Sequence, residues 1–226
     1  MAKKPAQKTR ENLIGAALDL FGRFGFEGTS TRAIADAANA NLAAIKYHFG
    51  GKDGLYNAVA EHIAAQIKAA MGDAVAAASA EAMPLTPETA RHALEQIIEG
   101  FTTLLVTNPA TESWGRFIVR EQMSPSPAFD ILYEQGMGNV ITLTTRLVAA
   151  ICKLEDDSEQ ARLTAITMIG QVLVFRVARA AVMRATGWER IGGREHDAIR
   201  TVIGNSLARL GPPPAREKAA PGENAR

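Results

Sequence analysis

Three consecutive side chains near the N-terminus, Lys46, Tyr47 and His48, combine positive charge, an aromatic ring and hydrogen-bond donors, and Lys52 follows four residues later. Lys52 stands at the expected start of a helix, where free N–H groups and the positive end of the helix dipole also favour an anion. The surrounding segment predicts a helix, a tight turn, a helix, a short turn and another helix. This layout is typical of a helix-turn-helix unit, which places one helix in the major groove of DNA.

The elements that must position these side chains are predicted from apolar spacing and from turn residues. A first helix over about 9–24 carries one apolar stripe. Ser30 can cap the N-terminus of a second helix, and Asn41 can cap a third over 42–49. The tight turn between them usually needs a positive φ, which Asn39 tolerates next best after glycine.

The N-terminal residues of the inserted helix face the base edges in such a unit. Here they are Leu42, Ala43 and Ala44, which offer thymine methyl groups apolar contact and no hydrogen bond. Sequence preference is therefore expected to depend on Lys46, on Arg32 and on DNA shape. From the preceding helix, Ser30 and Thr31 can add phosphate contacts that fix position but carry little sequence information.

The rest of the sequence predicts further helices and no strand, so the fold class is expected to be all-α with about nine helices. Helix four begins near Lys52, and Thr86 followed by Pro87 marks a later helix start. The last three helices are expected to start near Pro127, after Ser158 and near Arg194, and to end near Ile151, Ala185 and Leu210. Four segments are expected: a flexible basic arm (1–8), a DNA-binding head (9–56), a larger helical body (57–210) and a disordered tail (211–226).

Composition and charge narrow the function classes. Residues 1–55 hold eight Lys and Arg against five Asp and Glu, whereas the remainder holds 17 against 19, so the basic excess lies in the head. The single cysteine, Cys152, excludes an intrachain disulfide and a cysteine-based metal site. The sequence contains no signal-peptide core and no apolar run of about 20 residues, so a cytoplasmic protein without membrane contact is expected.

Catalytic motifs are missing from the sequence. The four histidines show no metal-ligand spacing, and the chain has neither a glycine-rich phosphate loop nor a Gly-x-Ser-x-Gly elbow. We therefore expect a protein that is not an enzyme and that carries no cofactor and no metal.

Residues 9–56 resemble the DNA-binding domain of the TetR family of transcriptional regulators. The motifs that carry the resemblance are Phe21-Gly-Arg-Phe-Gly-Phe26, Ser30-Thr-Arg-Ala-Ile-Ala35, Ile45-Lys-Tyr-His-Phe49 and Lys52-Asp-Gly-Leu55. The chain departs from the family pattern at Asn39, Ala40 and Lys46, which replace the turn glycine, a valine and an aromatic residue. In the body, 120–129 and 170–179 resemble the CecR-like branch of the family.

The resemblance implies that Tyr47 and His48 bind phosphate. The expected DNA contacts are then Ser30, Thr31, Arg32, Asn41, Leu42, Ala43, Ala44, Lys46, Tyr47, His48 and Lys52. Roles other than DNA binding stay open for three of these residues. Tyr47 can instead pack against the first helix, His48 can be exposed without a role, and Lys52 can be an ordinary solvated lysine.

The resemblance also implies a two-fold dimer that pairs through the last two long helices. The apolar rows expected to form a four-helix interface are Val172, Phe175, Ala178, Val182, Ile199, Val202, Ile203 and Leu207. The alternative is that these rows belong to the core of one chain.

The body is expected to hold a small-molecule pocket between helices. Its candidate lining is Phe101, Trp114, Phe117, Arg120, Tyr133, Met137, Met168, Gln171, Phe175 and Arg179, although aromatic residues and methionines at helical spacing are also ordinary core. Arginines in apolar helices require a partner. The partner can be Glu121 or Glu134, or it can be an anionic effector, for each of Arg120, Arg176 and Arg179.

Taken together, the sequence predicts a ligand-responsive transcriptional regulator. The resemblance implies a repressor that binds a palindromic operator as a homodimer and that a small-molecule effector releases from DNA. The alternative is a helical protein that binds a small molecule or a partner and carries a non-functional DNA-binding head.

Overall fold

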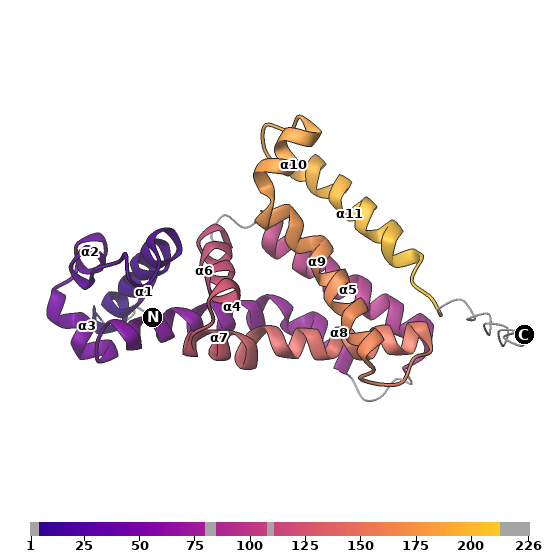
Figure 1. Cartoon of the computed structure of the whole chain (residues 1–226), viewed down its shortest axis with the longest axis horizontal. Coiled ribbons are helices and arrows are strands. Elements are labelled where there is room, and N and C mark those ends of the chain that lie inside the picture. The colour runs from indigo at the N-terminus through magenta and orange to yellow at the C-terminus, as the bar shows by residue number, and fades with distance from the viewer. Residues whose placement is uncertain (1–4, 80–84, 108–110, 213–226) are drawn as a thin grey trace, which may run out of the picture.

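The computed structural model describes residues 5–79, 85–107 and 111–212, and these residues form helices and no strand (Figure 1). The expected disordered tail lies outside the described residues from position 213 onward, as does the first half of the basic arm. The helices are α1 (Pro5–Phe24), α2 (Thr31–Ala37), α3 (Leu42–Phe49), α4 (Lys52–Ser79), α5 (Pro87–Thr107), α6 (Thr111–Met123), α7 (Pro127–Leu132), the π-helical segment η1 (Tyr133–Met137), α8 (Gly138–Cys152), α9 (Glu159–Val177), α10 (Arg179–Thr186) and α11 (Gly193–Ala208). The predicted all-α fold is confirmed.

The N-terminal head consists of α1, α2, α3 and the start of α4, which lie together at one end of the molecule (Figure 1). Each head helix turns its apolar face inward, so that Leu13, Phe21, Ile34, Ile45 and Leu55 are buried together. Removing these side chains from water is the main force that holds three short helices in place. The head thereby presents α3 on a fixed support.

Helix α4 joins the head to the body without a linker, because it runs unbroken through the expected boundary at 56/57. Its buried residues recur every fourth position, from Leu55 through Val59, Ile63 and Ile67 to Met71. This spacing keeps one stripe of the helix against α1 in the head and against α5, α7 and η1 in the body. Helix α4 is therefore part of the packing of both the head and the body.

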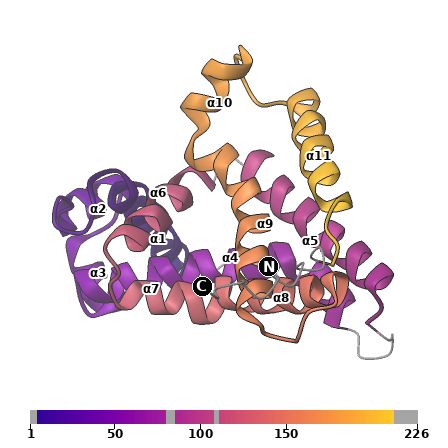
Figure 2. The same cartoon turned by 45° about the vertical axis from the view of Figure 1, so that its right-hand side comes forward.

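The body packs α5 against α4, α8, α9 and α11, while α6 leans against α1 (Figures 1 and 2). The figures show α10 and α11 at the far side of the body from α4. Within the described ranges, no single helix is both long and apolar enough to cross a membrane. The pair α9 and α10 reaches that length and composition only together, and it is bent by 78°.

Two expected long helices are interrupted, so nine predicted helices become eleven α-helices and one π-helical segment within the described ranges. The helix expected to start near Pro127 contains η1, where Gly136 lies so close to α4 that an added Cβ would sit 3.2 Å from Cα of Ala64. The helix expected to end near Ala185 breaks at Ala178, which leaves helical geometry with φ −99° and ψ 27°.

The N-terminal boundary also differs, since α1 begins at Pro5 rather than near Thr9. Proline is well suited to the first position of a helix because its missing N–H is not needed there. The hydroxyl of Thr9 donates to the carbonyl of Pro5, and Gln7 donates to Glu11 one turn later. Residues 5–8 of the expected flexible arm are therefore helical.

Candidate nucleic-acid interface

The turn between α2 and α3 has the geometry that the sequence predicts. Asn39 adopts a positive φ of 49°. The side chain of Ser30 accepts a hydrogen bond from the N–H of Ala33, and that of Asn41 accepts one from the N–H of Ala43 at 2.8 Å. Both N-caps satisfy N–H groups that the first turn of a helix leaves unpaired. Local contacts therefore fix where each of the two helices begins.

Helix α3 presents one exposed face made of Leu42, Ala43, Lys46 and Tyr47. Lys46 follows Ala43 by three positions and Leu42 by four, and Tyr47 follows Ala43 by four, which places the four residues on the same side of the helix. Tyr47 is 82% exposed, so the alternative that it packs against α1 is wrong. An exposed aromatic side chain beside an exposed lysine is a surface suited to a partner rather than to water.

The inner face of α3 holds the residues that anchor it. Ile45 is buried, and Ala44 and Phe49 are partly buried against the core of the head. Ala44, which the sequence places among the base contacts, therefore faces more toward the core than Leu42 and Ala43 do. Phe49 belongs to the core, as predicted.

Polar side chains extend this face at both ends of the unit. Arg32 is exposed on α2, Thr31 is half-buried, and the exposed hydroxyl of Ser30 still has its hydrogen available for a phosphate while it accepts from the backbone. The half-buried ring of His48 packs between Tyr47 and Phe49, with centroids 4.9 and 6.0 Å away. The predicted contacts on α2 and α3 are thus close in space, apart from the inward position of Ala44.

Lys52 is held in place by an aromatic ring, since its ammonium lies 4.2 Å from the centroid of Phe26. This cation–π contact fixes a positive charge at the first turn of α4. Sequence reasoning missed a similar case in α1, where the guanidinium of Arg10 lies 5.3 Å from the centroid of Phe49. Phe49 is 39 positions from Arg10 along the chain, so spacing does not predict this contact. The positive charge of Arg10 is the only signal that the sequence offers.

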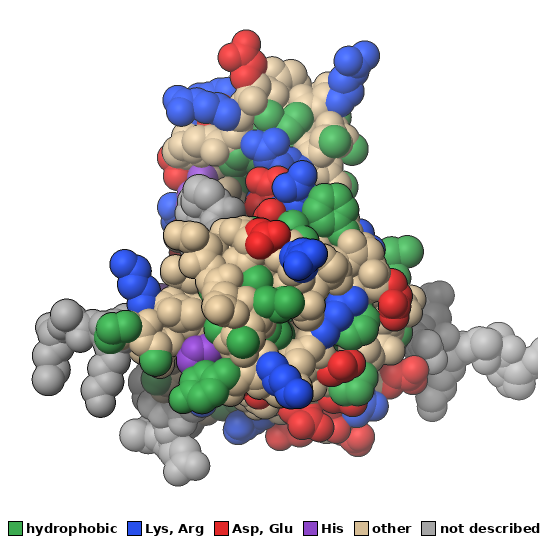
Figure 3. All heavy atoms as spheres, turned by 90° about the vertical axis from the view of Figure 1, so that its left-hand side faces the viewer, with side chains coloured by type: hydrophobic (Ala, Val, Ile, Leu, Met, Phe, Trp, Pro, Cys, Tyr) green, Lys and Arg blue, Asp and Glu red, His purple; other side chains and the backbone are tan. Residues whose placement is uncertain are grey.

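The end of the molecule formed by the head shows Lys and Arg side chains mixed with apolar ones rather than one dense basic patch (Figure 3). Electrostatic attraction to a phosphate backbone scales with the number of charges that meet it. The head is therefore suited to a modest number of phosphate contacts supported by apolar contact.

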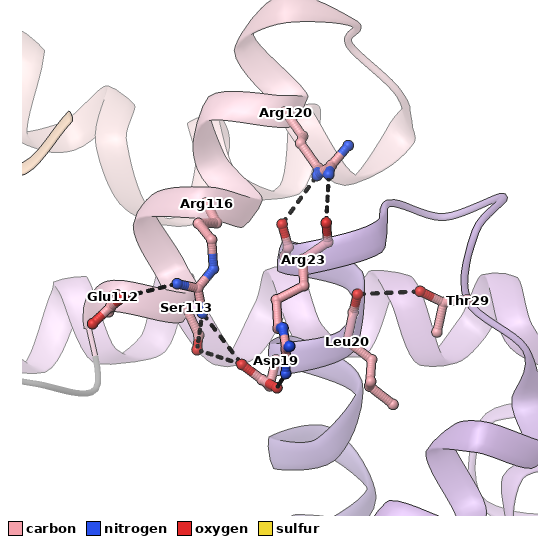
Figure 4. Close-up of polar contacts among 9 residues, drawn as sticks. Asp19, Leu20, Arg23, Thr29, Glu112, Ser113, Arg116 and Arg120 are labelled. Atoms are coloured by element: carbon pink, nitrogen blue, oxygen red, sulfur yellow. Dashed lines mark hydrogen bonds and ion pairs between the residues drawn. The ribbon is translucent and has the colours of Figure 1, made fainter. Parts of the chain in front are cut away.

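The head is joined to α6 by polar contacts that the sequence does not reveal (Figure 4). The guanidinium of Arg120 donates to the carbonyl oxygens of Gly22 and Arg23 at the end of α1, at 3.0 and 2.8 Å. The expected partners Glu121 and Glu134 are therefore wrong for Arg120, because the last carbonyls of α1 lack partners within their helix and attract a cation. Glu121 instead accepts from the hydroxyl of Tyr56 at 2.6 Å and from Ser126.

The expected effector lining does not converge on one of the described cavities. Trp114 and Phe117 are buried in the core, and the ring of Phe117 lies 4.7 Å from that of Tyr56. Tyr133 is 45% exposed and packs against Phe129 at the surface. Of the predicted lining, only Arg120 and Arg179 share a described groove, which lies between α1, α6 and the junction of α9 with α10.

Some of the apolar residues expected at a dimer interface lie in the core of the protomer, and others lie at its surface. Ile199, Ile203 and Leu207 are buried against α5, and Val172 is also buried within the protomer, so the core alternative holds for these four. Val202 is 64% exposed. A different row on α9 remains open to solvent, and its apolar members are Leu163, Ile166, Leu173, Val174 and Val177.

The fold and this exposed helix define a helix-turn-helix transcriptional regulator with a helical body. Two family models agree: "Bacterial regulatory proteins, tetR family" matches residues 13–59, and "HTH-type transcriptional dual regulator CecR, C-terminal domain" matches residues 90–211. The chain belongs to the TetR family and has a CecR-type C-terminal domain. It is therefore a transcriptional regulator and not an enzyme.

One curated relative supports this family assignment, and two solved structures share the fold. The chain is 32% identical to the HTH-type transcriptional dual regulator CecR of Shigella flexneri over 87% of its own length and 88% of the relative. A putative transcriptional regulator from Pseudomonas aeruginosa PAO1 has a similar structure, with a TM-score of 0.62, 17% identity and coverage of 92% and 93% of the two chains. AibR, solved with isovaleryl coenzyme A and operator DNA, gives a TM-score of 0.63 at 15% identity, with coverage of 91% and 99%.

Proposed function

We propose that this regulator is a homodimeric repressor that binds a palindromic operator and is released by a small-molecule effector. The observation that carries the proposal is the exposed face of α3, where Leu42, Ala43, Lys46 and Tyr47 project from a helix whose opposite face is anchored by Ile45. The remaining contacts come from Ser30, Thr31, Arg32, Asn41, His48 and Lys52. Such a protein acts on chromosomal DNA, so we place it in the cytoplasm.

Base readout on this surface is expected to be sparse. Leu42 and Ala43 can only touch thymine methyl groups, and Lys46 is the exposed hydrogen-bond donor nearest to them on α3. A single head with these few contacts would bind weakly. Two heads related by two-fold symmetry would read two half-sites about one helical turn, or roughly 34 Å, apart.

The exposed row on α9 supports the dimer. Leu163, Ile166, Leu173, Val174 and Val177 recur at helical spacing, and Val202 on α11 adds a further exposed apolar side chain. Exposed apolar side chains along one helix are unfavourable in water and are suited to burial against a second copy. We therefore move the proposed interface from the buried face of α11 to this row on α9.

The effector is proposed to act by shifting the population of body conformations. If it binds better to a form whose heads are wrongly spaced, DNA affinity falls by the ratio of its two affinities. Helix α4 is suited to carry the change, because its buried stripe contacts both the head and the body. AibR provides a precedent for a related fold with an acyl coenzyme A and operator DNA.

The direct test is selection of bound duplexes from a random pool with the purified full chain. We expect a palindrome with two half-sites, and we expect Lys46→Ala to relax the preference at one position of each half-site. Lys68→Ala, which removes an exposed lysine on α4 away from α3, serves as the matched control. A pool that shows no enrichment, with a chain that stays monomeric, would overturn the proposal in favour of a protein with a non-functional head.

A further inference from the structure

A groove of about 530 Å³ lies between the end of α1, α6 and the junction of α9 with α10, apart from the proposed DNA-binding face of the head. Five arginines line it, Arg23, Arg116, Arg120, Arg176 and Arg179, and they meet one lining carboxylate, that of Glu112. No residue of α2 or α3 is among those that line it. Figure 4 shows the wall formed by α1 and α6.

The arginines of this groove are only partly neutralised. Arg116 pairs with Glu112 at 2.9 Å and with Asp19 at 3.2 Å, and Arg23 pairs with the same Asp19 at 3.4 Å. Arg120 bonds backbone carbonyls, which do not cancel its charge. Within the described ranges, no carboxylate lies within ion-pair distance of Arg120, Arg176 or Arg179.

The guanidinium of Arg176 contains a nitrogen that is unpaired within the described part of the chain. Its Nη2 atom is buried and has no hydrogen-bond partner among the described residues, and the same holds for Nε of Arg116. Leaving a buried guanidinium N–H unpaired is unfavourable, so native structures normally supply an acceptor. Burial lowers the pKa of Arg176, Glu112 opposes that shift, and the nearby charges of Arg179 and Arg116 add to it. An acceptor with negative charge is what this site lacks.

The backbone leaves room for the guanidinium of Arg176 over α6. A Cβ added to Gly115 would lie 3.5 Å from both Cγ and Nε of Arg176, in ordinary contact, so the arginine stem already rests on this glycine. The stem is thereby held on α6, and its planar fork forms part of the wall of the groove. Planar guanidinium groups bind phosphate and carboxylate oxygens in pairs of hydrogen bonds, which a lysine ammonium cannot do.

We propose that this arginine groove is an anion-binding site for a small molecule that carries a phosphate or a similar dianionic group. The anion accepts from Arg176 at the end of α9, from Arg179 at the start of α10, and from Arg116 and Arg120 on α6. Because Arg120 also holds the last carbonyls of α1, a bound anion ties the body to the head. The groove contains Arg120 and Arg179 of the expected effector lining but none of its aromatic residues or methionines.

The test titrates inorganic pyrophosphate into the full chain at constant ionic strength, with calorimetry as the readout and chloride as the background anion. No DNA is present, so the result does not depend on the proposed repressor function. We expect saturable binding by the natural chain and at least tenfold weaker binding by Arg176→Gln, since a charged hydrogen bond contributes a factor of this order. Arg162→Gln is the matched control, because Arg162 lies on α9 and pairs with Asp157 outside the groove.

A second variant, which is expected to bind more tightly, distinguishes loss of the anion site from loss of folding. Glu112→Gln removes the carboxylate that competes for Arg116, so we expect it to bind pyrophosphate several times more tightly than the natural chain. Binding that is absent from the natural chain, or equal in Arg176→Gln and Arg162→Gln, overturns the proposal.

Discussion

The hydroxyl of Tyr56 donates a 2.6 Å hydrogen bond to the carboxylate of Glu121, and both side chains are buried between the head and α6. The ring of Tyr56 also packs edge-on against Phe21 and Phe26 of the head and lies 4.7 Å from Phe117 of α6. Burial, reinforced by the hydrogen bond and the charge of Glu121, raises the pKa of Tyr56, so its hydroxyl stays protonated as the donor. One residue on α4 thus joins the apolar core of the head to a charged group of the body.

The first prediction concerns this bond. Tyr56→Phe keeps the ring contacts but removes the donor from a buried carboxylate, so we expect the free energy of unfolding to fall by about 1.5–3 kcal/mol. Urea denaturation measures the change. Tyr133→Phe, at a tyrosine that is 45% exposed, is the control and should change stability by less than about 0.5 kcal/mol. Equal effects of the two variants would show that the bond contributes little.

A second prediction separates DNA binding from stability. Tyr47→Ala should weaken binding to every duplex tested while the unfolding midpoint stays unchanged, because this side chain is 82% exposed. Lys52→Ala should reduce the slope of log affinity against log salt by about one for each head. Affinity measured by fluorescence anisotropy at several salt concentrations checks both. If a variant that carries both substitutions binds DNA as tightly as the natural chain, the DNA-binding surface lies elsewhere.

The third prediction compares two glycines of α1. An added Cβ at Gly22 would lie 3.1 Å from the backbone oxygen of Ser113 in α6, whereas one at Gly15 meets nothing within 4 Å. Gly15→Ala should raise stability by about 1 kcal/mol through helix propensity alone. Gly22→Ala should lose that gain and fall below the natural chain by about 1 kcal/mol or more, because two helices must separate. Thermal unfolding of both variants tests the close approach of head and body.

A fourth prediction concerns pH. Burial lowers the pKa of His62 below its ordinary value of 6.5, and the charge of Arg10 adds to this shift while Glu11 opposes it. The unfolded chain then takes up the proton first as the pH falls. The stability contributed by neutral His62 is therefore full above pH 6.5 and is lost as the pH falls toward the lower folded pKa.

Urea denaturation at pH 7.5 and pH 5.5 measures this effect. We expect the natural chain to lose stability on acidification and His62→Gln to lose less. His92→Gln, at an exposed histidine of α5, should leave the loss unchanged. Identical pH dependence in all three chains would contradict the role of His62.

The fifth prediction tests the proposed dimer surface. Ile166→Asp places a charge in the exposed row of α9, where the side chain is 51% exposed, so the protomer should keep its fold while the dimer dissociates. Leu85→Asp, at a 42% exposed leucine before α5, should leave the assembly unchanged. Sedimentation velocity distinguishes the two outcomes. A dimer that survives Ile166→Asp would locate the interface on another face.

The sequence by itself determined the local features of this protein. The N-caps Ser30 and Asn41 and the positive φ of Asn39 depend on contacts within three residues along the chain, so residue type is enough to predict them. The periodicity of apolar residues likewise predicted which positions of α4 are buried. These features, together with the motifs around Lys46, were sufficient for the fold class and the family.

Only the tertiary structure decided what each face packs against. Ile199, Ile203 and Leu207 lie on an apolar face that the sequence identifies, but only the position of α5 shows that the face is filled within the protomer. The partner of Arg120 is a pair of carbonyls 97 and 98 positions away, and the Nη2 atom of Arg176 is buried without a described partner only in the folded chain. Periodicity specifies a direction around a helix axis, whereas a partner depends on how distant helices are placed, which one-dimensional spacing does not encode.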